Sequence, residues 1–600
     1  MVRRNKVPPG TGYRSLARLA RSLLLGFCLA AGVTAPARGE LERPAPEAAT
    51  AQGGAAAVHS REFMAVTAHP LASEAAAAML RAGGSAVDAA IAAQLVLNLV
   101  EPQSSGIGGG ALALHFDGRT VRAYDGRETA PRAAREDLFL HPDGTAMGFP
   151  EAVVGGRSVG TPGVLRLLEM MHRRHGRLPW ADLFAPAIAL AEQGFPVGPR
   201  LHALLAKEKD LVADPAARAY FYRPDGSPWP VGHRLKNPEL AKVFRRLAEE
   251  GSDAFYVGTL ARDIVARVRS HPTNPGLLDE TDLAAYWPLT REPVCLRHAG
   301  LRICGFPPPS SGGIGVGQIL GIVGRLQIKD YPPRPGSGPL MPDGTAVHLF
   351  AEAGRLAFAD RAAFVADPAF QRIPAGLLDD SYLDARARLV GEKSLGTALP
   401  GRPPGAVAGA PDGTDERPAT SHLSIVDREG QAVALTTTIE SGFGSRLMVH
   451  GFLLNNQLTD FAFAPTAAGK PVANRVQPGK RPRSSMAPTL VLDAKGELKA
   501  VLGSPGGPWI INYVAKTLVG ILDWGLDLDA AIALPHFGSR NGPTELEAGR
   551  FDGVGKDALK ARGHAVTEGE MTSGLAGIVR TPVGWTGAAD PRREGSAVGR

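Results

Sequence analysis

Apolar and polar residues alternate with a period of two in residues 420–438, the pattern of a β-hairpin. The first strand reads T-S-H-L-S-I-V and the second Q-A-V-A-L-T-T-T. Gly430, between them, supplies the left-handed position of a turn. A Gly/Pro-rich linker, residues 400–418, runs directly into the first strand.

The hairpin register follows from the length of its loop. If residues 428–430 form the loop, Asp427 faces Gln431 and Thr420 faces Thr438. Facing residues of an antiparallel pair lie close enough for a threonine-to-threonine hydrogen bond. The simpler interpretation of the same pattern is two β-formers in an ordinary strand.

Apolar residues at intervals of three and four predict helices through much of the chain. Ser85, with Asp88 three residues later, forms a capping box for an apolar helix that ends before Glu101. An Ala-rich helix at residues 71–81 precedes it, and we expect these two helices to pack face to face. Further helices are predicted at residues 164–175, 180–193, 240–250, 254–268, 348–366 and 509–522.

Two glycine-rich segments invite a binding interpretation. Residues 104–110 read S-S-G-I-G-G-G, but a phosphate loop must open a helix, and residues 111–116 alternate like a strand, which excludes a nucleotide loop. A second hairpin is predicted at residues 484–502, and G-S-P-G-G follows it at 503–507, directly before a helix. Glycine amides there attract negative charge, as a helix cap or as an oxyanion hole.

The formal charge of +7 is concentrated at the beginning of the chain. Residues 1–37 contain six basic residues and no acidic ones, so the rest is nearly neutral and gives no reason to expect a nucleic-acid partner. A basic start, an apolar run and the sequence A-P-A at its end predict a secretory signal peptide at residues 1–37. We therefore expect export to the periplasm or the extracellular space.

Cys295 and Cys304 are the two cysteines beyond this leader. With a two-residue turn at Ala299-Gly300 they face each other at a non-hydrogen-bonded position, where the Cα separation of roughly 4.5 Å suits a disulfide. We predict the bridge, and two free buried thiols are the alternative. The chain shows no zinc-like Cys/His spacing and no G-x-S-x-G nucleophile elbow.

Four motifs resemble those of the γ-glutamyltranspeptidases, which belong to the N-terminal nucleophile hydrolases. They are T-S-H-L-S-I-V-D at 420–427, F-L-L-N-N-Q-L-T-D at 452–460, K-R-P-R-S-S-M-A-P-T at 480–489 and G-S-P-G-G at 503–507. The resemblance implies an α+β fold, a four-layer αββα sandwich built from two subunits cut from one precursor. It implies neither a metal nor an organic cofactor.

The resemblance also implies self-cleavage between Ala419 and Thr420. A γ-glutamyl amide is a poor electrophile, so it requires an activated nucleophile, a base and oxyanion stabilisation. A threonine at a new N-terminus supplies both nucleophile and base, because its free amine has a reference pKa of roughly 7.7 to 8.0. The implied products are a large subunit, residues 38–419, and a small catalytic subunit, residues 420–600.

The family's functional residues carry over to matching positions. Thr438 is expected to orient Thr420, and the amides of Gly506 and Gly507 to form the oxyanion hole. The expected donor is glutathione or another γ-glutamyl amide, and the acceptor is water, an amino acid or a peptide. The residues expected to hold the substrate's α-carboxylate are Arg127, Ser484 and Ser485, and those expected to hold its α-ammonium are Glu440, Gln457 and Asp460.

Two departures from the family pattern are visible. Glu440 stands where many relatives have Asn, while Gln457 stands where some have Glu. The segment 462–477 is short and lacks the tyrosine that covers the substrate in some relatives, so we expect an open groove in which hydrolysis exceeds transfer.

Two alternative functions remain open from the sequence. A cephalosporin (glutaryl) acylase uses the same kind of nucleophile, but its glutaryl group has no α-amine to meet Glu440 and Asp460. An exported binding protein on the same scaffold would never be cut. His422 is interpreted as a packed strand residue rather than a base.

Overall fold

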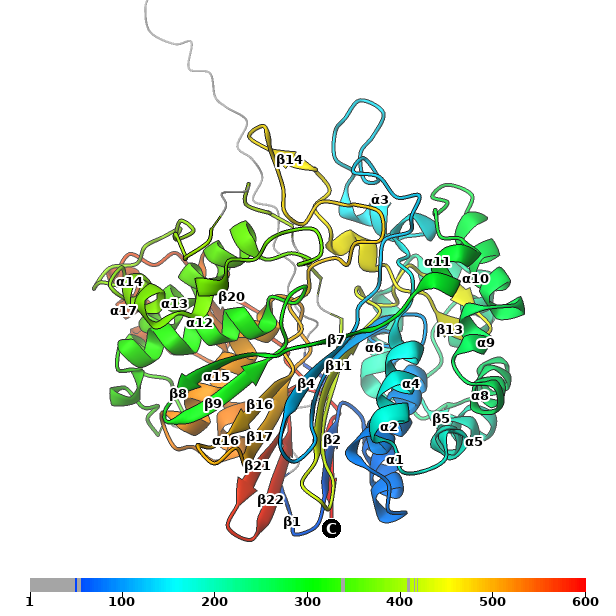
Figure 1. Cartoon of the computed structure of the whole chain (residues 1–600), viewed down its shortest axis with the longest axis horizontal. Helices are drawn as coiled ribbons and strands as arrows, with labels where there is room; N and C mark the ends of the chain where they lie inside the picture. Colours follow the sequence, from blue (N-terminus) through cyan, green and yellow to red (C-terminus); the bar gives the residue numbers. More distant parts are fainter. Residues whose placement is uncertain (1–48, 51–55, 336–339, 407–409, 415, 418) are drawn as a thin grey trace, which may run out of the picture. The chain divides into compact units, whose positions relative to one another are not determined.

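Two seven-stranded antiparallel sheets, packed face to face, form the centre of the fold (Figure 1). The computed structural model describes residues 49–50, 56–335, 340–406, 410–414, 416–417 and 419–600, so the predicted signal peptide lies outside the described residues. The first sheet has the order β23 (Ser596–Gly599), β2 (Met64–Thr67), β10 (Ser421–Val426), β11 (Ala432–Thr438), β3 (Gly110–Phe116), β4 (Val121–Gly126) and β7 (Leu289–Arg291). The second has the order β1 (Val58–Ser60), β22 (Gly584–Ala589), β21 (Ala576–Thr581), β17 (Leu498–Gly503), β16 (Thr489–Leu492), β9 (Leu301–Gly305) and β8 (Val294–His298).

The side chains of β10 alternate between two environments. Leu423 and Ile425 pack in the apolar cluster that includes the helices of one outer layer. Val426 packs in the cluster that joins the two sheets to the other helical layer. Between the sheets, the hydroxyl of Ser424 donates to the carbonyl of Ala576 on β21 at 2.9 Å. A strand buried on both faces is therefore held between two layers.

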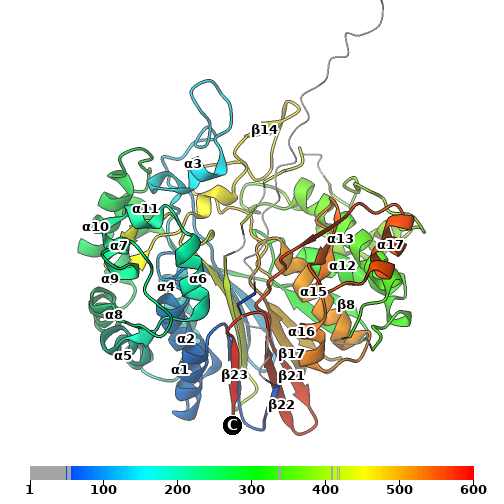
Figure 2. The ribbon, with the colours of Figure 1, turned by 180° about the vertical axis from the view of Figure 1, so that it is seen from behind.

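Helices α1 (Pro70–Arg81) and α2 (Ala86–Val100) cover the outer face of the first sheet (Figure 2). The predicted capping box is present, because Ser85 and Asp88 each accept a backbone hydrogen bond from the other residue. Every residue of α2 is buried, as expected for a helix between a sheet and further helices. The predicted contact between the two helices is confirmed.

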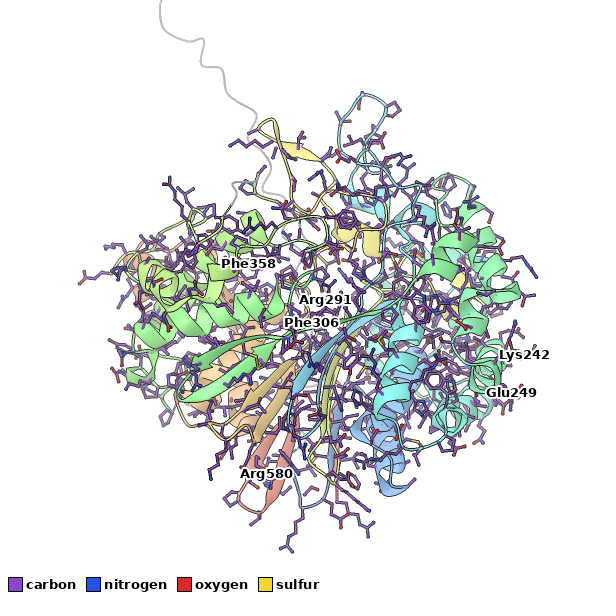
Figure 3. The ribbon with its side chains drawn as sticks, in the orientation of Figure 1. Lys242, Glu249, Arg291, Phe306, Phe358 and Arg580 are labelled. Atoms are coloured by element: carbon purple, nitrogen blue, oxygen red, sulfur yellow. A yellow bond between two sulfur atoms is a disulfide. The ribbon has the colours of Figure 1, made fainter. Side chains whose placement is uncertain are left out.

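Helices α12 (Gly312–Arg325), α13 (Gly344–Phe364), α15 (Trp509–Leu522) and α16 (Leu528–Ala533) lie on the second sheet's side. In Figure 3, Phe358 of α13 and Phe306, which follows β9, point into this side of the core, whereas Lys242 and Glu249 of α8 (Pro238–Glu250) reach outward. The layers are thus helix, sheet, sheet and helix, and the αββα architecture is confirmed.

The outer helices match the predicted ranges with two differences. The range 180–193 begins as a 3-10 helix, Trp180–Phe184, before α5, Ala185–Gln193. The range 254–268 is two helices, α9 (Asp253–Tyr256) and α10 (Thr259–Arg269), because Gly258 between them has φ +92°. The remaining α-helices in the described part of the chain are α3 (Phe149–Val153), α4 (Val164–His175), α6 (Pro199–Lys207), α7 (Pro215–Phe221), α11 (Glu280–Ala285), α14 (Asp380–Ala387) and α17 (Gly553–Ala561).

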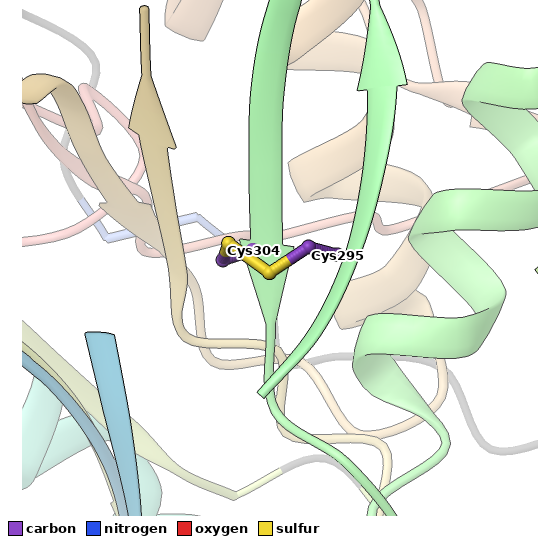
Figure 4. Close-up of a disulfide and its surroundings, with 2 residues drawn as sticks. All are labelled: Cys295 and Cys304. Carbon is purple, nitrogen blue, oxygen red and sulfur yellow. A yellow bond between two sulfur atoms is a disulfide. The ribbon is translucent and has the colours of Figure 1, made fainter. Parts of the chain in front are cut away.

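Strands β8 and β9 form the hairpin predicted around Ala299 and Gly300, both of which have positive φ. Cys295 pairs with Cys304 in this register, and the two form a disulfide with a Cα separation of 4.1 Å (Figure 4). The bond ties the edge strand β8 to its neighbour.

Candidate active site

The hairpin of β10 and β11 has the register that the sequence predicts. Ser421 pairs with Thr437, Val426 pairs with Ala432, and Gly430 in the turn has φ +79°. Thr420 therefore lies at the end of a central strand, one residue before its first paired position. It is 4% exposed.

Thr438 contacts the peptide bond before Thr420 rather than the side chain of Thr420. Its hydroxyl donates to the carbonyl oxygen of Ala419 at 2.9 Å and accepts the backbone N–H of Glu440 at 2.7 Å. The sequence predicted a hydrogen bond between the two threonines, and the structure shows one that polarises the Ala419 carbonyl instead. Attack on this carbonyl would place negative charge on the oxygen that Thr438 already contacts.

One buried cavity of about 20 Å³ brings together residues from distant parts of the sequence. Arg127 enters it from the end of β4, Gln457 and Asp460 from a 3-10 helix at Gln457–Asp460, and Gly507 from the start of α15. The complete lining is Arg127, Glu416, Arg417, Thr420, Thr438, Glu440, Gln457, Asp460, Ser484, Ser485, Met486, Gly507 and Ile510.

Arg127 is almost fully engaged inside the protein. Its Nη2 donates to Asp460 Oδ2 at 2.5 Å and to the carbonyl of Arg483 at 2.8 Å, and its Nε donates to the carbonyl of Pro482 at 3.1 Å. Gln457 Nε2 donates to the same Asp460 oxygen at 2.7 Å. Charge-assisted contacts of this kind fix side chains firmly.

Three buried acids, Asp460, Glu128 and Glu440, lie in or beside this cavity. Burial raises the pKa of Asp460 to about 6 although Arg127 opposes the change, and burial raises the pKa of Glu128 to about 8. Burial, together with the negative charge of Asp460, raises the pKa of Glu440 well above its ordinary value. A cationic group entering this cavity would favour ionisation of these acids, which is what an α-ammonium group requires.

Glu440 is held by two hydrogen bonds in the intact chain. Its Oε1 accepts the backbone N–H of Arg417 at 3.0 Å and its Oε2 accepts Asn456 Nδ2 at 2.5 Å. Its φ of +78° is unusual for a residue with a side chain and is maintained by these contacts. Arg417, just before the cleavage position, thus hydrogen bonds to a carboxylate that was expected to bind the substrate.

Two glycines directly before α15 have backbone conformations that favour glycine. Gly506 and Gly507 have φ values of +134° and +56°. A Cβ on Gly506 would lie 2.7 Å from Cε2 of Tyr513, so no larger residue fits there. Gly507 lines the cavity beside Thr420, close to the beginning of a helix whose dipole favours negative charge.

His422 is a packed strand residue, as predicted. It is fully buried between the sheets, hydrogen bonds to the hydroxyls of Thr436 and Ser424, and its pKa is lowered to about 3 by burial. A histidine in that state is neutral and enclosed, and the cavity around Thr420 does not include it.

A cluster outside the cavity has the composition of a metal site. Ligand atoms of His348, Glu352 and His564 lie within 4.8 Å of one another. The two imidazoles hydrogen bond to each other at 2.7 Å, and Glu352 accepts from Arg355 at 2.9 Å and Ser394 at 2.8 Å. The two imidazoles are thus paired with each other and Glu352 with Arg355 and Ser394, so the cluster is a hydrogen-bonded polar network that joins α13 to the C-terminal part of the fold.

The sequence did not identify four of the residues around the cavity. Glu416 and Arg417 line it from the end of the linker, where composition suggested only a connector. Arg361 of α13 and Arg483 contact Glu416, and only Arg483 lies within a motif, directly before the two serines.

The fold is a four-layer αββα sandwich, and a threonine at the end of a central strand directly follows a peptide carbonyl that accepts a hydrogen bond. This combination is typical of the N-terminal nucleophile hydrolases. The family model described as gamma-glutamyltranspeptidase matches residues 72–600, and the chain belongs to this family. Several relatives are named as proenzymes of hydrolases and acylases, and the chain is an enzyme of this family rather than a binding protein.

Similar proteins include both hydrolases and acylases. The glutathione hydrolase proenzyme of Bacillus subtilis is 36% identical over 560 residues, covering 90% of this chain and 92% of that protein. The acylase ACY 1 proenzyme of Pseudomonas sp. strain SE83 is 36% identical over 549 residues, covering 89% and 93%. The crystal structure of cephalosporin acylase from Bacillus halodurans superposes with a TM-score of 0.78 at 26% identity, covering 92% of this chain and 99% of that one.

Proposed function

We propose that the chain is a self-cleaving γ-glutamyl hydrolase and transferase whose nucleophile is Thr420. In the first reaction the Thr420 hydroxyl adds to the carbonyl carbon of Ala419, and the peptide C–N bond breaks to leave an ester. That step transfers the hydroxyl proton to the departing nitrogen and frees the Thr420 amine. Water then hydrolyses the ester to give the Ala419 carboxylate and to regenerate the Thr420 hydroxyl. The products are residues 38–419 and 420–600. The hydrogen bond from Thr438 to the Ala419 carbonyl oxygen supports this step.

The free amine then serves as the base in the second reaction. It accepts the proton of the Thr420 hydroxyl as the oxygen attacks the γ-carbonyl of the donor, and it returns the proton to the leaving amine. A γ-glutamyl ester forms on Thr420, and water, an amino acid or a peptide takes the γ-glutamyl group. The amides of Gly506 and Gly507 stabilise the oxyanion of each tetrahedral intermediate.

The substrate class rests on one observation, the pattern of charges in the cavity, which matches a zwitterionic donor. Arg127 with Ser484 and Ser485 forms the side proposed for the α-carboxylate. Glu440, Gln457 and Asp460 form the side proposed for the α-ammonium, and two of these three are buried acids. Glutathione, with a free α-amino acid end on its γ-glutamyl group, has the matching charges.

The acylase function is the second candidate, because the Pseudomonas acylase is as similar to this chain as the Bacillus hydrolase is. A glutaryl group carries no ammonium, so it would leave Glu440 and Asp460 without a cation. The test is kcat/KM of the purified enzyme on L-γ-glutamyl-p-nitroanilide and glutaryl-p-nitroanilide. The proposal requires the γ-glutamyl donor to be preferred at least tenfold, and preference for the glutaryl donor would reverse the assignment.

We also propose export, to the periplasm or the extracellular space, on the basis of the leader at residues 1–37. The Cys295–Cys304 disulfide is compatible with an oxidising compartment. Among the described residues, no helix has both the length and the apolar character needed to cross a bilayer. Sequencing the N-terminus of the large subunit tests the proposed removal of the leader, which predicts a start near residue 38.

A further inference from the structure

The segment that precedes the cleavage position places a carboxylate inside the substrate cavity. We propose that Glu416 occupies, in the uncut chain, the position of the donor's α-carboxylate, and that Arg361 binds that carboxylate once the segment has left. Arg361 is then a specificity-determining residue of the mature enzyme. The proposal rests on the proposed function and goes beyond it by naming a further arginine and an internal substitute for the substrate.

Glu416 is held by the contacts that a substrate carboxylate would need. Its Oε2 accepts the hydroxyl of Ser485 at 2.6 Å, and its Oε1 is contacted by Nη2 of Arg361 and, at 3.4 Å, by Nε of Arg483. Nη2 of Arg361 also donates to the Ser485 hydroxyl at 2.8 Å, and its Nε donates to Ser311 at 2.8 Å. One serine expected to bind substrate thus already binds a carboxylate.

The electrostatics of Glu416 are those of a bound anion. Burial alone would raise its pKa, but the attraction of Arg361 and then of Arg483 outweighs burial and leaves the pKa below its ordinary value. Glu416 is 4% exposed, so the ionised carboxylate lies in the cavity and not in solvent. These two arginines therefore form a site for an ionised carboxylate.

Arg127, which also lines the side proposed for the α-carboxylate, is held mainly by protein groups in the uncut chain. Its Nε and Nη2 are engaged with two backbone carbonyls and with Asp460, and its Nη1 lies 3.7 Å from Glu128. A bidentate grip on a substrate would require some of these contacts to break. Arg361 already binds a carboxylate, that of Glu416, beside Ser485.

Glu416 has to leave the cavity before the donor's α-carboxylate can enter. The cavity of about 20 Å³, with Glu416 and Arg417 in its wall, has room for about one water molecule. When Glu416 leaves, Arg483 keeps Asp412 at 2.9 Å if that residue stays in place, whereas Arg361 loses its carboxylate partner. A buried charge without a partner is strongly unfavourable, and the donor's α-carboxylate restores the pairing.

The test compares donors with and without an α-carboxylate. The variants are Arg361→Gln and Arg361→Lys, and the matched control is Arg355→Lys. Arg355 lies on the same helix, is also buried, and donates to Glu352 at 2.9 Å and Thr544 at 2.8 Å, away from the cavity. The donors are L-γ-glutamyl-p-nitroanilide and 4-aminobutanoyl-p-nitroanilide, which lacks only the carboxylate.

Arg361→Gln is expected to lower kcat/KM for the γ-glutamyl donor by about 10- to 100-fold, mainly through KM, since it removes a hydrogen bond to a charged group. It should change kcat/KM for the 4-aminobutanoyl donor by less than about threefold. The kcat/KM of Arg361→Lys for the γ-glutamyl donor should lie between those of wild type and Arg361→Gln, because lysine keeps the positive charge but lacks the paired N–H donors of a guanidinium. Equal losses on both donors, no loss on either, or the same pattern in Arg355→Lys would overturn the proposal. If the wild-type enzyme does not prefer γ-glutamyl to glutaryl donors, the proposed function fails instead.

A binding measurement covers the case in which Arg361 variants are not cut. Calorimetry with L-glutamate and 4-aminobutanoate compares the uncut chains Thr420→Ala and Thr420→Ala/Glu416→Ala. Removing Glu416 should tighten L-glutamate binding by about tenfold or more and leave 4-aminobutanoate unchanged, and adding Arg361→Lys should cancel the gain. Equal affinity for L-glutamate in the two chains would refute the role assigned to Glu416.

Discussion

Replacing Thr438 by valine removes one hydroxyl and almost no volume, so it isolates the contact that we hold responsible for self-cleavage. The hydroxyl donates to the Ala419 carbonyl oxygen at 2.9 Å, and that oxygen becomes the oxyanion when Thr420 attacks. Removal of a single oxyanion-hole donor lowers rates by about 10² to 10³, or roughly 3 to 4 kcal/mol of barrier. We expect Thr438→Val to slow cleavage by that factor.

The same substitution affects stability to a smaller extent. The Thr438 hydroxyl also accepts the N–H of Glu440 at 2.7 Å, and an unpaired buried donor costs about 1 to 3 kcal/mol. Thr438→Ser keeps the hydroxyl and restores both contacts, so it separates loss of chemistry from loss of packing.

The assay follows conversion of full-length chain into two fragments on a denaturing gel, after purification of each variant under conditions that slow cleavage. The rate of cleavage is expected to be highest in the wild type, slightly lower in Thr438→Ser, and lower by about two to three orders of magnitude in Thr438→Val. Cleavage of Thr438→Val at the wild-type rate would refute the reasoning, as would a Thr438→Ser variant as slow as Thr438→Val.

Three further predictions address the nucleophile, the buried histidine and the disulfide. Thr420→Ala should remain a single chain without γ-glutamyl activity, whereas Thr420→Ser should be cut and active; a cut and active Thr420→Ala would contradict the mechanism. His422 is neutral in the folded protein because burial lowers its pKa to about 3. In the unfolded chain its imidazole takes up a proton below about pH 6.5. The contribution of the buried neutral imidazole to stability is therefore full above about pH 6.5 and is lost as the pH falls toward 3. Between pH 6 and pH 4 the wild type should therefore lose about 2 kcal/mol more than His422→Gln in urea unfolding, and identical pH profiles would count against this. Cys295→Ala/Cys304→Ala should reduce the free energy of unfolding by about 2 to 3 kcal/mol, the chain-entropy value for so short a loop, while leaving kcat/KM unchanged; an unchanged midpoint of urea unfolding would argue against a stabilising bond.

Local pattern was sufficient to predict the elements that carry the nucleophile. The alternation around Gly430 gave both strands and their register, because a three-residue loop leaves only one way to pair Asp427 with Gln431. The capping box at Ser85 located the start of α2 for a similarly local reason. Where a single glycine interrupted helical spacing, at Gly258, the pattern predicted one helix and the structure has two.

The sequence pattern could not predict contacts between segments that lie far apart in the chain. Arg361 lies on a helix whose buried arginines look alike in sequence, and only the fold separates the one that contacts Glu416 from Arg355, which contacts Glu352. The linker composition gave no indication that Glu416 enters the cavity. The resemblance supplied Arg127, Asp460 and the serines, but the use of Arg127 as an internal partner of Asp460 follows from the geometry alone.

The central claim is that the peptide bond between Ala419 and Thr420 is cut to create an N-terminal nucleophile. Intact-mass and N-terminal analysis of the small fragment of purified active enzyme tests it most directly. The small fragment is expected to begin Thr-Ser-His-Leu. Full γ-glutamyl activity in a chain that remains whole, or in one cut at any other bond, would contradict it.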